Sequence, residues 1–128
     1  MWSMKREGTR ESREMYLKAI YQLSKIQSGN VRNRDIANYL NVTRPSVTRA
    51  VALLNKENLA ITDKNGFVSL TKEGETEAER INDRYQTIIE FFKKNVELDE
   101  KTICTDACQM EHIISDELFE AMQQKLEN

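Results

Sequence analysis

The chain has 128 residues, of which 39% are hydrophobic and 31% are charged, with four glycines and one proline. That length allows one core with at most a small accessory unit, and that composition excludes a disordered chain and favours a helix-rich globular protein. The net charge of −2 is the sum of a basic part and an acidic part. Residues 1–72 have 13 Lys and Arg against 6 Asp and Glu, whereas residues 73–128 have 6 Lys and Arg against 15 Asp and Glu. We therefore expect the first part to bind a polyanion and the second to bind cations or a second copy of itself.

The first two predicted elements are helices. Apolar residues recur at helical spacing from about Glu11 to Gln27, and Gly29 and Asn30 follow as a stop signal. The segment NRDIANYLNV (33–42) predicts a short second helix that ends near Asn41.

The next segment, TRPSVTRAVALLNKENL (43–59), predicts a third helix. Thr43 is its candidate N-cap, and Pro45 lies in the first turn, where its missing N–H is harmless. One face is apolar and carries Val47, Val51 and Leu54. Two short helices joined by a turn of about three to four residues form a helix-turn-helix, whose second helix reads the DNA major groove.

The other face of this third helix supplies the candidate DNA-binding residues. They are small, polar or basic, and include no acid; they are Thr43, Arg44, Pro45, Ser46 and Arg49. Such a face suits a DNA groove better than a protein core. Solvated surface charge is the alternative for Arg49 and for the basic part as a whole.

The segment LAITDKNGFVSLT (59–71) predicts a β-hairpin, with Ile61 in one strand, residues 67–70 in the other and Lys64-Asn65-Gly66 as the turn. We therefore expect a winged domain whose wing is the only sheet. Thr71 is the candidate cap of a long helix, Lys72 to Lys94, that joins the basic part to the acidic one. The inner side of that helix carries Ile81, Tyr85, Ile88, Ile89 and Phe92.

Two further helices are predicted in the acidic part. A shorter one carries CTDACQMEH (104–112), and SDELFEAMQQKLEN (115–128) forms the last, capped by Ser115 or Asp116. We expect a mainly α protein in two helical layers, with a winged helix-turn-helix DNA-binding domain at 1–72 and a helical dimerisation and metal-binding domain at 73–128. Because each half alone buries little, we expect a homodimer through the last helices.

The stretch CTDACQMEH contains both cysteines and the only histidine of the chain. On a helix Cys108, Glu111 and His112 stand at i, i+3 and i+4, and Cys104 lies one turn earlier. Thiolate, carboxylate and imidazole on one face predict a divalent transition-metal site that needs further ligands from elsewhere. A buried cysteine beside a hydrogen-bonded histidine is the alternative.

Three segments together resemble a known family. EMYLKAIYQL (14–23), RPSVTRAV (44–51) and DACQMEHIISDEL (106–118) resemble the diphtheria-toxin-repressor family of metal-dependent transcriptional repressors, which includes a manganese-transport-regulator branch. The resemblance covers nearly the whole chain in the same order. It implies a winged-helix repressor that binds a palindromic operator in double-stranded DNA.

The resemblance also implies a primary metal site. In the iron-responsive branch the ligands are the Met of E-M-Y-L and the Cys, Glu and His of C-x-x-E-H, which fall here on Met15, Cys108, Glu111 and His112. Helical spacing puts Met15 at the margin of an apolar stripe, where ordinary packing is the alternative role.

The chain departs from the family pattern at two points. The second metal position of the family falls here on Gln86, Glu90 and Cys104, of which Glu90 alone keeps the family residue. Gln is a poor replacement for imidazole, so a second metal is doubtful, although Cys104 is still a candidate ligand. We expect no SH3-like C-terminal domain.

The donor set predicts which metal is sensed. The sulfur donors of Met15 and Cys108 suit iron(II), whereas manganese(II) prefers oxygen ligands, and the manganese branch carries acidic residues at both positions. We therefore expect an iron(II)-responsive repressor of metal homeostasis, with a manganese-responsive regulator as the alternative.

Two proteins of other classes fit part of the pattern. A thiol-based redox sensor would use Cys104 and Cys108, and peroxide rather than a chelator would release its DNA. A hydrolase would use Cys108 activated by His112, but the sequence offers no orienting third residue and no oxyanion-hole motif. We expect a regulator and not an enzyme.

No run of 18 apolar residues occurs, and the first twelve residues lack the apolar stretch of a signal peptide. We therefore expect a cytoplasmic protein with no membrane partner. In that reducing compartment a structural disulfide between the two cysteines is not expected.

Overall fold

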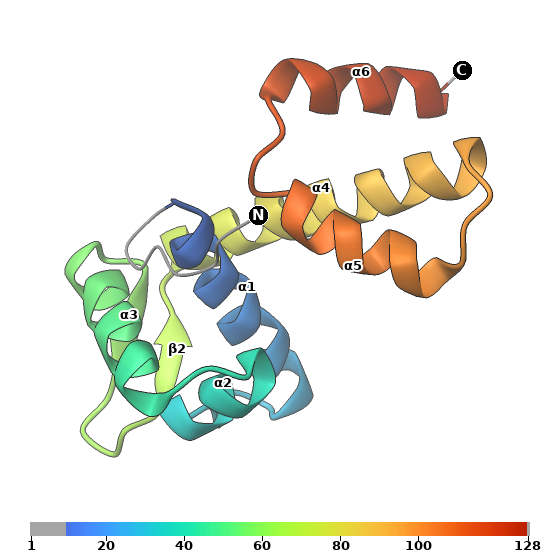
Figure 1. The fold of residues 1–128 in the computed structure, drawn as a ribbon. Helices are drawn as coiled ribbons and strands as arrows, with labels where there is room; N and C mark the ends of the chain where they lie inside the picture. The colour runs from blue at the N-terminus through green and yellow to red at the C-terminus, as the bar shows by residue number, and fades with distance from the viewer. Residues whose placement is uncertain (1–9, 128) are drawn as a thin grey trace. The chain divides into compact units, whose positions relative to one another are not determined.

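The computed structural model describes residues 10–127 and is mainly helical, with one small sheet in the described part (Figure 1). The elements follow one another as α1 (Arg10–Ile26), α2 (Asn33–Leu40), α3 (Arg44–Lys56), β1 (Ala60–Thr62), β2 (Val68–Leu70), α4 (Lys72–Asn95), α5 (Glu100–Met110) and α6 (Asp116–Glu127). Two compact units divide between Glu79 and Arg80, inside α4. The fold class expected from the sequence, a winged helix-turn-helix followed by a helical region, is confirmed.

The first unit is built around an apolar face of α1. The buried residues of this unit lie on α1, α2, α3, the wing and the start of α4, with Val31 in the connection between α1 and α2. They include Leu17, Ile20, Val31, Ile36, Val47, Leu54, Val68 and Ala78. The backbone leaves α1 through Ser28 and Gly29, which have φ values of 54° and 85°, so the predicted stop at Gly29 is confirmed by a left-handed turn that glycine adopts easily.

The turn between α2 and α3 is short and locally determined. Asn41 ends α2 in the left-handed conformation, with φ 57°, which asparagine tolerates better than most residues. Thr43 then caps α3, because its side-chain oxygen accepts a hydrogen bond from the Ser46 backbone N–H at 3.3 Å. Both the end of α2 and the cap of α3 agree with the sequence prediction.

The wing is an antiparallel hairpin in which Ala60 pairs with Leu70 and Thr62 with Val68. Its turn is organised by Asp63, whose Oδ1 accepts hydrogen bonds from the backbone N–H groups of Asn65 and Phe67 at 2.8 and 2.9 Å. The sequence prediction placed Phe67 in the second strand, and this was wrong by one residue. The Asp63 carboxylate takes the Phe67 N–H, so the residue belongs to the turn.

The second unit is held together where three helices meet. Ile88 and Ile89 of α4, Ile103 and Ala107 of α5, and Met122 of α6 form its buried cluster.

The predicted cap of α4 is confirmed, since Thr71 Oγ1 accepts a hydrogen bond from the Gly74 N–H at 3.0 Å.

The last two helices also have side-chain caps. Asp99 accepts the Thr102 backbone N–H at 3.0 Å at the start of α5. Of the two residues predicted to cap the last helix, Ser115 is the cap, because its Oγ accepts the Leu118 N–H at 3.1 Å. No described helix has the length and apolar character needed to cross a membrane.

Candidate functional site

The candidate DNA-binding residues lie together at the start of α3. Arg44, Pro45 and Arg49 are exposed, and Ser46 is half-buried. Val47 on the opposite face is fully buried against the rest of the unit. The α3 helix therefore presents a basic, small-residue face to solvent, which is the shape and charge that a major groove accepts.

Side-chain hydrogen bonds hold the first turn of this helix. The Thr43 hydroxyl donates to the Ser46 hydroxyl at 2.9 Å, in addition to accepting the Ser46 N–H. Thr48 is exposed one turn later, and its hydroxyl donates to the Arg44 carbonyl at 3.1 Å. Sequence reasoning did not single out Thr48, although its helical position puts it on the same exposed face.

A second residue that sequence reasoning missed is Arg32, which holds the tip of the wing. Its Nη1 donates to the Asn65 carbonyl at 2.8 Å, and its guanidinium lies over the Phe67 ring at 4.1 Å. This cation–π contact joins the residue before α2 to the hairpin turn. Lys64, in the same hairpin turn, is exposed. No sequence signal pairs Arg32 with Phe67, since 35 positions separate them.

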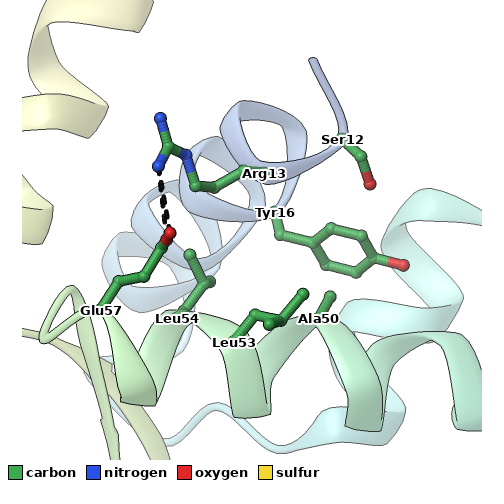
Figure 2. Close-up of a pocket in the computed structure, with 7 residues that line it drawn as sticks. All are labelled: Ser12, Arg13, Tyr16, Ala50, Leu53, Leu54 and Glu57. Atoms are coloured by element: carbon green, nitrogen blue, oxygen red, sulfur yellow. Dashed lines mark hydrogen bonds and ion pairs between the residues drawn. The ribbon is translucent and has the colours of Figure 1, made fainter. Parts of the chain in front are cut away.

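Packing between α1 and α3 leaves a cavity of about 240 Å³. Figure 2 shows the Tyr16 ring reaching over α3 and an ion pair between Arg13 and Glu57, whose atoms lie 3.4 Å apart. Ser12, Ala50, Leu53 and Leu54 complete the lining. Met15 is half-buried on α1, one residue before Tyr16. The Arg13–Glu57 ion pair joins α1 to the end of α3.

The candidate metal ligands of the second unit are only partly assembled. Glu111 and His112 are buried, with 1% and 7% of their surface exposed, and Glu111 Oε1 lies 3.3 Å from His112 Nε2. Cys108 is exposed. Within residues 10–127 no group of three or more His, Cys, Asp and Glu side chains lies close enough to hold a metal ion.

The end of α5 explains this partial assembly. The sequence prediction put Cys108, Glu111 and His112 on one helical face, but α5 ends at Met110. The Glu111 N–H still bonds four residues back to Ala107, whereas the His112 N–H bonds three residues back to Gln109. This last turn is tighter than an α-helix. This tighter bond moves His112 away from the helical i+4 position, while Glu111 keeps a helical backbone conformation. The carboxylate and the imidazole lie together, and within residues 10–127 no third His, Cys, Asp or Glu side chain completes a group that could hold a metal ion.

Tyr85 on α4 lies beside these residues, where the sequence had placed it in an apolar stripe. Burial, together with a hydrogen bond to Cys104 and the nearby Cys104, Cys108 and Glu111 groups, raises the pKa of Tyr85 to about 12. The bond favours the protonated phenol, so the hydroxyl donates to the Cys104 sulfur. Tyr85 is therefore a neutral donor next to two of the candidate metal ligands.

The three residues of the candidate second metal site lie on two helices and differ in exposure. Gln86 and Glu90 are exposed on α4. Cys104 is half-buried and packs against the apolar cluster of the second unit. Its thiol is already engaged by Tyr85.

The donor set of the primary site suits a transition metal by its chemistry. A Cys108 thiolate and a Glu111 carboxylate would balance a double positive charge, and a neutral imidazole and a thioether are additional ligands. Two of these donors, Glu111 and His112, already lie buried side by side. The residues present therefore fit a divalent transition-metal ion.

Two family models match the chain in succession. Residues 9–68 match the DNA-binding N-terminal domain of iron-dependent repressors, and residues 71–128 match their metal-binding and dimerisation domain. A helix-turn-helix transcriptional regulator of Methanocaldococcus jannaschii is 32% identical over 88% of this chain and 90% of its own length.

Two longer proteins are also similar. The diphtheria toxin repressor of Corynebacterium diphtheriae is 28% identical over 84% of this chain and 47% of its own length. The solved structure of the manganese regulator SloR is 30% identical, with a TM-score of 0.78 over 90% of this chain and 53% of SloR. The chain thus spans about half the length of these two proteins.

Proposed function

Because the chain belongs to the iron-dependent repressor family, we propose that it is an iron(II)-responsive transcriptional repressor of metal homeostasis. Matches to both the DNA-binding and the metal-binding domains make it a metal-dependent, DNA-binding regulator and not an enzyme. The observation that carries the choice of iron is the donor set: Met15 and Cys108 contribute sulfur, and Glu111 contributes oxygen. Sulfur donors favour iron(II) and the later divalent ions over manganese(II).

Manganese is the alternative effector, because the similar protein SloR is described as a manganese regulator. In a test tube zinc, copper or nickel would bind such ligands more tightly than iron does, so availability must select the ion in the cell.

Met15, Cys108, Glu111 and His112 would hold the ion. When bound, it supplies a positively charged link between donors that are far apart in the sequence. Met15 stands on α1, whose neighbouring residues Arg13 and Tyr16 face α3. Fixing α1 would therefore also restrict the position of the DNA-facing helix.

The DNA-bound form is a homodimer in this proposal. Two copies of α3 must enter successive major grooves of a palindromic operator, which sets their spacing. Leu98, Ile113 and Leu118 of the second unit are each about half exposed or more, at 59%, 50% and 47%. Apolar side chains of this kind support a dimer contact.

The proposal is tested by an anaerobic metal titration with DNA-binding anisotropy. The probe is a duplex that this protein selects from a random-sequence pool in the presence of iron(II). We expect iron(II) to tighten binding at a lower free concentration than manganese(II) does. By linkage, the duplex must tighten metal binding by the same factor.

The same titration separates the alternatives. Activation by manganese at the lower free concentration would replace iron by manganese as the effector. Release of DNA by peroxide, with no response to metal or chelator, would instead support a redox sensor that uses Cys104 and Cys108.

A further inference from the structure

Arg84 is a buried arginine that binds the short connection between α5 and α6. Only 3% of its surface is exposed. Its Nε donates to the Glu111 carbonyl at 3.2 Å, its Nη2 to the Ile114 carbonyl at 2.6 Å and its Nη1 to Asp116 Oδ1 at 2.9 Å. One guanidinium thus contacts both ends of the connection.

The surroundings of Arg84 fix its orientation. Its guanidinium carbon lies 5.0 Å from the centre of the Phe119 ring, so the α6 side chain covers the charged group. A buried charge is costly unless its donors are satisfied, and here each of the three nitrogens has an oxygen partner. The planar fork of arginine makes several such bonds in one fixed geometry, which a lysine cannot do.

The bonds to the backbone carry more weight than the bond to Asp116. The Asp116 side chain is 83% exposed, although that of Arg84 is 4% exposed, so water screens this carboxylate and can take its place as the partner of Nη1. The carbonyl oxygens of Glu111 and Ile114, in contrast, belong to the turn that contains His112. Arg84 therefore restrains the backbone of this turn more than it ties α4 to α6.

We propose that Arg84 is the positioning residue of the metal site: it holds the Glu111–His112 turn so that the carboxylate and the imidazole are oriented before the ion binds. The inference rests on the proposed metal-dependent function. Arg84 touches no candidate donor atom in this role, because its bond to Glu111 goes to the carbonyl and not to the carboxylate.

The test is an anaerobic cobalt(II) titration of the full chain, followed by visible absorption. Arg84→Met removes all three bonds at similar side-chain length. Asp116→Asn is the matched control, because it removes the charge of Asp116, keeps an oxygen acceptor for Arg84 and leaves both backbone bonds in place. Loss of a residue that orients metal ligands commonly lowers metal affinity by roughly 10–100-fold. We expect a loss of that order in Arg84→Met, a change in its cobalt d–d bands, and wild-type affinity and bands in Asp116→Asn.

Arg84→Lys is the rescue variant. It keeps the buried charge but not the fork, so we expect an affinity between those of the wild type and Arg84→Met. If Arg84→Met does not fold, as judged by circular dichroism, Arg84→Lys carries the test with the same criteria. A folded Arg84 variant with the wild-type affinity and cobalt spectrum overturns the positioning role, even if its melting temperature is lower.

The proposed metal site itself is tested by the wild type in the same experiment. A cobalt complex without a sulfur-to-metal charge-transfer band overturns the site, and the inference with it. A wild-type band accompanied by unchanged Arg84 variants overturns the positioning role alone.

Discussion

The two candidate sites of this chain are built in opposite ways. The candidate DNA-binding residues lie within residues 43–49, at the start of one capped helix, and all but one of them are exposed. The candidate metal ligands come from residue 15 and from the end of α5, and they range from exposed Cys108 to buried Glu111. A site made of neighbours along one helix follows from local structure, whereas a site made of scattered donors depends on which side chains tertiary packing turns inward.

The largest effect should come from the metal site. Cys108→Ala and His112→Ala each remove one donor, so we expect both to lose metal-activated DNA binding while keeping the fold. The loss in metal affinity should exceed the roughly 10–100-fold that the loss of a ligand-orienting residue costs. DNA-binding anisotropy at a series of free iron(II) concentrations measures it.

Thr105→Ala is the matched control for this prediction, because Thr105 is exposed on the same helix and is not a candidate metal donor. It should keep the metal response and the cobalt charge-transfer band, and Cys108→Ala should lose both. The primary site is wrongly assigned if Cys108→Ala or His112→Ala still responds to metal at wild-type concentrations.

A smaller effect is expected at the DNA-facing helix. Arg49→Ala should weaken operator binding by about 1–3 kcal/mol and relax base preference, if Arg49 pairs bidentately with guanine. Lys25→Ala removes an exposed charge from the end of α1 and should leave base preference unchanged. Anisotropy with the selected duplex and with base-substituted duplexes provides the measurement. Unchanged operator affinity in Arg49→Ala would remove α3 from the reading role.

The smallest effect concerns the local structure of the DNA-binding site itself. Thr43→Ala removes the side-chain cap of α3, which should lower the free energy of unfolding by about 1 kcal/mol. Thr48→Ala, one turn inside the same helix, should change it by less than about 0.5 kcal/mol, because an exposed helical threonine gains helix propensity on becoming alanine. Urea unfolding of both variants without DNA gives the difference. Equal stabilities would show that the cap is not what holds the first turn.

Local chemistry explains why the first unit was largely predictable. The stop after α1, the end of α2 at Asn41, the Thr43 cap and the Lys64-Asn65-Gly66 turn each use residues whose backbone preferences favour that structure. Even the error at Phe67 was a shift of one position at a strand end, where prediction is weakest.

In the second unit, local sequence patterns predicted the helices but not the arrangement of the candidate metal ligands. Its helices and the cap of its last helix were predicted, yet the Asp99 cap of α5, the tightened last turn of α5 and the burial of Glu111 and His112 beside an exposed Cys108 were not. Tyr85 beside Cys104 and Arg84 on the α5–α6 connection were also missed as parts of the site. Each of these contacts joins residues that are 19 or more positions apart, or depends on which way a helix end is turned by its neighbours.

By itself the sequence determined the helices, the wing, the exposed basic face of α3 and the identity of the candidate metal donors, because caps, turns and apolar periodicity act over a few residues. Only the tertiary structure decided which donors are buried, how the last turn of α5 ends and which arginine restrains it. Burial and side-chain pairing depend on packing between helices, and a buried guanidinium is stable only where the fold brings three oxygen acceptors to it.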